Sequence, residues 1–113
     1  MDTTAPALTV IYSVTANKEI QGIWKQNAKL YGSAEHATDY VNFLYEHMER
    51  LTTSYEAGRE VESNEKLRYI VMKRSNRGMG HIAVYRITKS AVRVVHVFHT
   101  SQDWEKKVKP RSK

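Results

Sequence analysis

The spacing of apolar positions along the chain changes from strand-like to helix-like and back again. Residues 8–14 are rich in β-branched and aromatic side chains, which is typical of a strand. Across residues 20–31 apolar side chains recur every three or four positions, which predicts an amphipathic helix with Thr15 as its N-cap and Gly32 at its end. Ser33 can cap a second helix of the same kind. The first half of the chain therefore predicts a strand and then a helical hairpin with a very short connection.

From residue 67 onward apolar and polar residues alternate, as they do in strands. The segments with this pattern are residues 67–73, 81–87 and 92–98. Short loops join them, so neighbouring strands should run antiparallel. Residues 52–66 are polar and include Gly58, which predicts a connecting loop with at most a partial helical turn near Glu56. The expected fold is α+β: an N-terminal strand, an α-helical hairpin, then a three-stranded antiparallel β-meander packed on the helices.

The last strand breaks abruptly into polar and ionisable residues, which makes its end a candidate for function. Alternation assigns Val92, Val94, His96 and Phe98 to one face and Arg93, Val95, Val97 and His99 to the other. Both faces are largely apolar, so the strand should be central in the sheet. Because His96 and His99 fall on opposite faces, they should not share a metal ion, and we interpret His96 as a core residue. His99 can act as a general acid or base, or it can simply cap the sheet.

Length and composition limit the class of protein. The chain has 113 residues and no cysteine, which indicates a single domain, residues 1–113, without disulfides or thiolate metal sites. No apolar run is long enough to span a membrane and the N-terminus lacks the features of a secretion signal, so we expect a cytoplasmic protein. Residues 1–7 are expected to form a flexible tail, and residues 105–113 a basic one.

Charge is distributed very unevenly between the two halves of the chain. Residues 1–65 carry 5 Lys/Arg and 10 Asp/Glu, a net charge of −5, whereas residues 66–113 carry 13 Lys/Arg and 2 Asp/Glu, a net charge of +11. This cationic half favours an acidic partner, either a nucleic acid backbone or an acidic protein segment. The candidate binding residues, interleaved with tyrosines, are Arg68, Lys73, Arg74, Arg77, Arg86 and Arg93. Arginines on an exposed sheet face can equally be ordinary solvated residues.

The end of the chain resembles the ParE branch of the RelE/ParE superfamily, small toxins of bacterial type II toxin–antitoxin pairs. In that branch the final strand is an apolar run that closes on a His and, a few residues later, an Asp, which here are His99 and Asp103. The order of elements is also similar, and the resemblance extends from Leu8 to Trp104. It implies an acidic, partly disordered antitoxin that covers the basic sheet and the helical hairpin. Asp103 and Trp104 join the basic residues as candidate target-binding residues.

The resemblance implies two different modes of action. ParE-like members inhibit DNA gyrase through protein contacts and need neither a catalytic set nor a cofactor, and we favour this mode. RelE-like members are ribosome-dependent endoribonucleases that cleave mRNA, and here the catalytic residues would be His81, Arg93 and His99. Ile82 and Ser101 stand where the best-known nucleases carry arginine, which argues against cleavage. A nontoxic RNA-binding module with the same fold is a third hypothesis.

Overall fold

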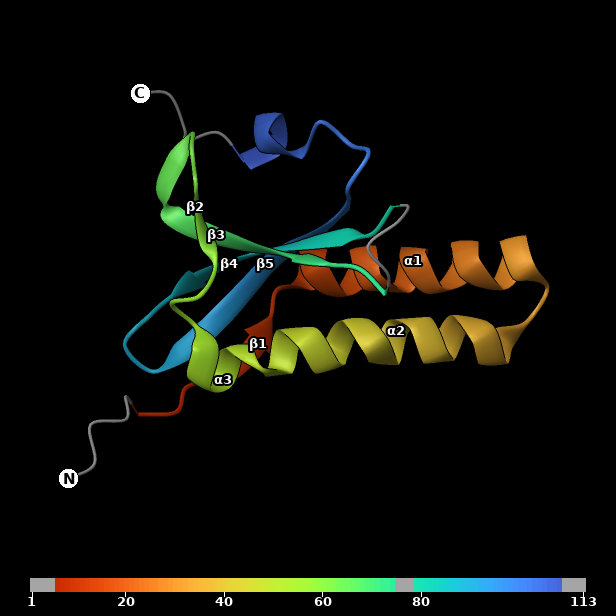
Figure 1. Ribbon diagram of the computed structural model, residues 1–113, viewed down its shortest axis with the longest axis horizontal. Helices are drawn as coiled ribbons and strands as arrows, with labels where there is room; N and C mark the ends of the chain where they lie inside the picture. The colour runs from red at the N-terminus through yellow and green to blue at the C-terminus, as the bar shows by residue number, and fades with distance from the viewer. Residues whose placement is uncertain (1–5, 75–78, 109–113) are drawn as a thin grey trace.

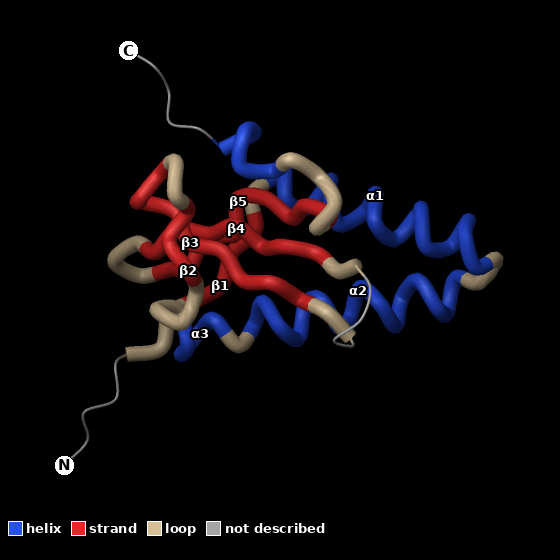
Figure 2. The backbone as a smooth tube through the Cα atoms, turned by 45° about the horizontal axis from the view of Figure 1, so that its top comes forward, coloured by secondary structure: helices blue, strands red, loops and turns tan. Residues whose placement is uncertain are grey.

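The computed structural model describes residues 6–74 and 79–108, which form a helical hairpin and a five-stranded sheet (Figure 1). The elements, in chain order, are β1 (Thr9–Tyr12), α1 (Val14–Tyr31), α2 (Ala34–Glu49), α3 (Leu51–Ser54), β2 (Arg59–Val61), β3 (Asn64–Met72), β4 (His81–Ile87), β5 (Ala91–His99) and the 3-10 helix η1 (Trp104–Val108). Helices α1 and α2 lie side by side, and the tip of the hairpin extends beyond the strands (Figure 2). The outer part of the hairpin is therefore not covered by the sheet.

The sheet has the strand order β1-β5-β4-β3-β2. β1 runs parallel to β5, and the other neighbouring strands are antiparallel. The predicted α+β fold, with a strand, a helical hairpin and an antiparallel meander, is confirmed, and β5 is a central strand as its apolar faces predict. The expected loop at residues 52–66 is only partly a loop, because it contains β2, which pairs with β3. A strand of three residues is too short to show alternation in the sequence.

The hairpin begins at Ser13, two residues before the predicted cap at Thr15. The Ser13 hydroxyl accepts a hydrogen bond at 2.9 Å from a backbone N–H in the first turn of α1 and donates one at 3.0 Å to the Val95 carbonyl. It therefore caps α1 and also ties the helix to β5, a contact that no local pattern indicates. At the tip, Gly32 ends α1 with a φ of 63°, and the side chain of Ser33 caps α2, both as predicted.

A β-bulge in β5 decides which of its side chains face the helices. The register between β4 and β5 shifts once, so that Val95 has no partner opposite it. As a result Val92, Val94 and Val97 all belong to the core under the helices, whereas Phe98 belongs to a cluster on the opposite face. The predicted alternation is therefore wrong beyond Val94, because the extra residue exchanges the two faces of the strand.

The two faces of the sheet are covered to different extents. The helices cover one face with a core whose largest fully buried side chains include Leu44, Met48 and Tyr85. The other side, which we call the open face, has a smaller cluster of Ile82, Val84 and Phe98. Only η1 packs on this cluster among the described residues, through Trp104 and Val108. The cluster itself is buried, whereas Arg86 and Arg93, further along β4 and β5, are exposed on this face.

The structure describes only part of each expected tail. Residues 105–108 belong to η1, in which Val108 is buried, so the basic tail does not begin at residue 105. Residues 1–5 and 109–113 lie outside the described residues. Among the helices described, none combines the length and the apolar character that crossing a membrane requires.

Candidate functional site

Two histidines meet where β4 begins and β5 ends. His81 and His99 are direct partners across this antiparallel pair of strands, and their rings meet edge to face with centroids 5.1 Å apart. His81 is only 7% exposed, so it is not a solvent-facing residue. The sheet register thus brings together two of the three residues that the nuclease hypothesis requires.

Tyr40, on α2, fixes the tautomer of His81, and burial keeps that ring neutral. The Tyr40 hydroxyl lies 2.6 Å from Nδ1 of His81. Burial raises the pKa of Tyr40, although the nearby charge of Arg74 opposes this shift, so the hydroxyl keeps its proton. Burial, and after it the charge of His99, lower the pKa of His81 to about 4. Near neutral pH the Tyr40 hydroxyl therefore donates to Nδ1 of a neutral imidazole, whose hydrogen lies on Nε2.

His99 is held by the loop that follows β5. The Ser101 N–H donates to Nδ1 of His99 at 3.1 Å, and the Ser101 hydroxyl lies 2.6 Å from the same atom. The backbone N–H of His99 donates to the side chain of Gln102 at 2.8 Å. Because Nδ1 acts as an acceptor, the hydrogen of a neutral His99 ring also lies on Nε2. Both imidazoles can therefore offer an Nε2–H donor to a third group.

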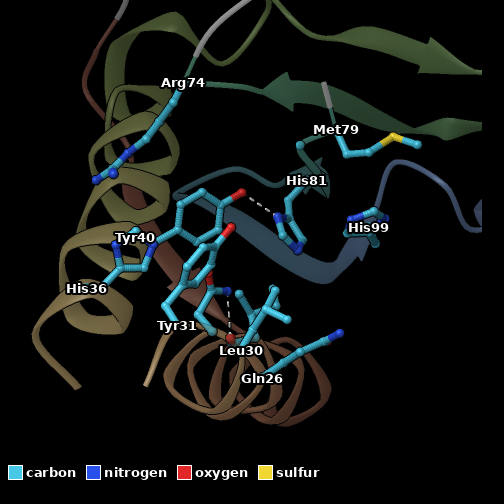
Figure 3. A pocket seen from close by; sticks show the side chains of 12 residues that line it. Gln26, Leu30, Tyr31, His36, Tyr40, Arg74, Met79, His81 and His99 are labelled. Atoms are coloured by element: carbon cyan, nitrogen blue, oxygen red, sulfur yellow. Dashed lines mark hydrogen bonds between the residues drawn. The ribbon is translucent and has the colours of Figure 1, made fainter. Parts of the chain in front are cut away.

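A cleft of about 410 Å³ lies between the helical hairpin and this end of the sheet (Figure 3). Its rim is apolar and strongly exposed: Leu30 is 71%, Tyr31 58% and Met79 65% exposed. The remaining lining residues are Ile23, Gln26, Asn27, His36, Tyr40, Arg74, Gly80, His81 and His99. No carboxylate lines the cleft among the described residues. An apolar rim around hydrogen-bond donors is a surface that a peptide or a small polar ligand can occupy.

Two of the candidate arginines hold the fold together. The Arg74 guanidinium donates to the backbone carbonyl of Asp39 at 3.0 Å and stacks over the rings of Tyr40 and Phe43, so it fastens the end of β3 to α2. The Arg68 guanidinium donates at 3.1 and 2.9 Å to two carbonyls of the loop before β2. Lys73 is exposed at the end of β3, and Arg77 lies outside the described residues.

The other two arginines lie on the open face, away from the histidines. Arg86 and Arg93 are direct partners on β4 and β5, and both are exposed. Arg93 is six residues from His99 along β5, a span of about 20 Å. The bulge at Val95 also puts Arg93 and His99 on opposite faces, although strict alternation predicts the same face. The structure therefore does not bring Arg93 into one site with His81 and His99.

The two residues after β5 that the sequence singles out have different surroundings. Asp103 pairs with Lys106 at 3.3 Å, and both side chains are largely exposed. Trp104 packs over the rings of Tyr69 and Phe98, at centroid distances of 4.8 and 6.3 Å. Trp104 thus anchors η1 to the open face, and its ring is partly available to a partner.

Sequence reasoning misses two residues that organise this region. One is Tyr40, which the helical spacing assigns to the core. The other is Glu19, whose carboxylate accepts hydrogen bonds from the Val97 N–H at 2.8 Å and lies 3.2 Å from Nδ1 of His96. His96 is therefore a half-buried residue with an acidic partner.

In the described part of the chain no three His, Asp or Glu side chains are grouped so that they could hold a metal ion.

A family model described as the ParE toxin of the type II toxin–antitoxin system, parDE, matches residues 10–104. The chain belongs to this family. The matched segment of this ParE-family toxin runs from β1 to Trp104, so it includes the hairpin, the sheet, the cleft and the His99–Asp103 ending. The predicted relation to the ParE branch and to type II toxin–antitoxin systems is thereby confirmed.

The ParE-family fold is also seen in a solved structure described as the chromosomal ParDE TA system from P. aeruginosa. The TM-score is 0.70 at 15% sequence identity, and the match covers 83% of this chain and 97% of the other. At this level of identity the likeness concerns the fold. No curated protein matches the chain in sequence.

Proposed function

We propose that this ParE-family toxin inhibits DNA gyrase and that an acidic antitoxin neutralises it. The family match over residues 10–104 is the observation that carries the proposal. Its name supports a toxin–antitoxin role, and the His99–Asp103 ending supports the gyrase-directed branch. The proposed target is thus inferred from the family, and the positions of the ionisable residues give the proposal further support.

That geometry favours a toxin that acts through contacts rather than through catalysis. At the histidine pair, the Tyr40 hydroxyl occupies Nδ1 of His81, and the pKa of His81 is lowered to about 4. An imidazole that binds a proton so weakly is a poor general base near neutral pH. Of the described candidate arginines, Arg74 lines the cleft but its guanidinium is engaged with the Asp39 carbonyl on α2, and Arg93 lies on the open face.

The cleft beside the histidines is the place that we propose for the antitoxin. Leu30, Tyr31 and Met79 expose apolar surface at its rim, which apolar side chains of an antitoxin helix or strand can bury. The lining has no carboxylate among the described residues, and the second half of the chain has a net charge of +11. An acidic segment therefore meets no charge repulsion from the cleft wall.

Plasmid supercoiling by gyrase, with and without the purified toxin, tests the proposal. We expect dose-dependent inhibition that a co-expressed acidic partner reverses. The variant Leu30→Glu should still inhibit gyrase but should resist reversal, because it puts a charge into the apolar rim. Val14→Glu is the matched control, since Val14 and Leu30 both lie on α1 and are both 71% exposed. Folded, partner-free protein that leaves supercoiling unchanged would contradict the gyrase proposal.

The histidine pair supports a second candidate, a ribosome-dependent endoribonuclease. Phosphodiester cleavage needs a general base and a general acid, and the two imidazoles, with rings 5.1 Å apart in one cleft, are side chains of the kind that supply them. The candidate predicts messenger cleavage in a translation reaction, mapped by primer extension, and a strong loss in His99→Ala. Cleavage that persists in His99→Ala would contradict a role for this pair.

A further inference from the structure

The Arg86–Arg93 pair is the strongest charged feature that the proposed function leaves unused. Tyr85 and Ile87, which flank Arg86, both contact the core under the helices, and so do the residues that flank Arg93. Side chains alternate along a strand, so both arginines project from the open face. Direct partners on antiparallel strands have Cα atoms about 5 Å apart. Two guanidinium groups therefore rise side by side from one surface.

This arrangement is unfavourable unless an anion joins it. Like charges directly opposite each other in a sheet destabilise the pair of strands. No carboxylate of the described residues forms an ion pair with Arg86 or Arg93, although Glu65 lies on the neighbouring strand β3. Asp103 and Glu105 line a shallow pocket with Glu62 of the turn between β2 and β3, and neither is ion-paired with Arg86 or Arg93. An external anion would relieve the repulsion that the fold leaves in place.

A further positive charge lies near the pair. Lys89, in the turn that joins β4 to β5, is exposed at the same end of the sheet, whereas Lys66 on β3 shares the face of Ile70 and Met72 under the helices. Two adjacent arginines on an exposed sheet face suit neighbouring phosphates better than a single carboxylate, because each arginine can bind one phosphate with two parallel hydrogen bonds. Both arginines are exposed and are direct partners across β4 and β5, so successive phosphates of one nucleic acid backbone can reach both.

We propose that the Arg86–Arg93 pair binds the phosphate backbone of duplex DNA. The inference rests on the proposed function, since a toxin that inhibits gyrase meets this enzyme on its DNA substrate. Contacts to phosphates would hold the toxin next to the enzyme–DNA complex and leave the cleft free for the antitoxin. Attraction to phosphates is independent of sequence and weakens steeply with salt.

Fluorescence anisotropy with a labelled duplex oligonucleotide tests the inference on the full chain without gyrase. The double variant Arg86→Gln/Arg93→Gln removes two charges, and the control Lys25→Gln/Lys29→Gln removes two from exposed positions on α1. We expect the arginine variant to bind at least about tenfold more weakly, and its plot of log affinity against log salt to be shallower by about two, because each phosphate contact contributes about 0.9 to this slope. The control should change affinity less than about threefold.

Three outcomes would overturn the inference: no binding by the folded protein at about 50 mM salt, equal losses in the two variants, or an unchanged salt slope in the arginine variant. Equal losses would mean that DNA is attracted to the net charge of the protein and not to the arginine pair.

A supercoiling assay distinguishes failure of this inference from failure of the proposed function. If the parent protein inhibits gyrase but does not bind DNA, only the DNA contact is overturned. If, in that case, the arginine variant also loses inhibition, the arginine pair contacts gyrase itself. DNA affinity without gyrase inhibition would support the contact and overturn the proposed target.

Discussion

The hydroxyl of Tyr40 lies 2.6 Å from Nδ1 of His81, and this hydrogen bond joins the helical hairpin to the sheet at the floor of the cleft. The two residues are 41 positions apart in the sequence, on α2 and β4. Arg74 adds a second link close by, because its guanidinium stacks over the Tyr40 ring. The position of the hairpin relative to the histidine pair therefore depends on Tyr40.

Tyr40→Phe should destabilise the fold by about 1–3 kcal/mol, because it leaves the buried Nδ1 of His81 without a donor. Urea denaturation of the variant and the parent protein measures this difference. Tyr31→Phe is the control: Tyr31 lines the same cleft, but it is 58% exposed and its hydroxyl makes no hydrogen bond to the described residues. Equal stability losses in the two variants would show that the hydrogen bond to His81 contributes nothing.

The low pKa of His81 makes stability depend on pH. Its pKa is lowered from 6.5 to about 4 in the folded protein, first by burial and then by the charge of His99. Between these values the unfolded chain binds a proton that the folded protein does not, so stability is full above about pH 6.5 and falls towards pH 4. The loss should reach about 3 kcal/mol.

Denaturation at several pH values checks this loss against the variant His81→Asn. The Asn side chain can still accept the Tyr40 hydrogen bond, but it does not titrate. We therefore expect a flatter profile for the variant between pH 6.5 and pH 4. Identical profiles for the two proteins would mean that His81 does not cause the acid sensitivity.

The helical hairpin is predictable from the sequence because its signals are local. The cap at Ser33 and the stop at Gly32 lie within a few residues of the backbone groups that they satisfy. The strand β2 is not predictable in the same way, since three residues form it only because β3 lies beside them. Elements with local signals are thus found, and elements that depend on a neighbour are missed.

The candidate site depends on register, which the sequence does not reveal. His81 and His99 are recognisable by residue type, but their meeting depends on how β4 and β5 align. The bulge at Val95 is equally hidden, and it separates Arg93 from His99. Alternation alone puts those two residues on one face and so suggests a catalytic set that the fold does not build.

Gly58 should not tolerate a side chain. A Cβ atom at this position would overlap the hydroxyl of Tyr85, whose side chain is fully buried. This hydroxyl accepts a hydrogen bond from the Gly58 N–H at 3.0 Å and donates one to the Tyr55 carbonyl at 2.7 Å. Gly58→Ala should therefore cost about 1–3 kcal/mol through overpacking and the disrupted hydrogen bonds.

Thermal denaturation of Gly58→Ala beside Gly22→Ala measures this cost. Gly22 lies in α1 with nothing within 4 Å of an added Cβ, so alanine there should stabilise the helix by about 0.5–1 kcal/mol. The two substitutions add the same methyl group and should shift the melting temperature in opposite directions. A neutral Gly58→Ala would mean that Tyr85 can move without loss.

Glu19 completes the hydrogen bonding of β5 where β1 no longer covers it. β1 pairs with β5 only as far as Val94, and beyond that point Glu19 on α1 accepts the Val97 N–H at 2.8 Å. Glu19→Ala leaves this N–H unpaired and should cost about 1–3 kcal/mol, whereas Glu19→Gln keeps an acceptor and should cost less. Amide hydrogen exchange at Val97 should accelerate in Glu19→Ala but not in Glu46→Ala, which alters an exposed carboxylate on α2. Unchanged protection of Val97 in Glu19→Ala would mean that the backbone of β5, and not the side chain from α1, shields this edge.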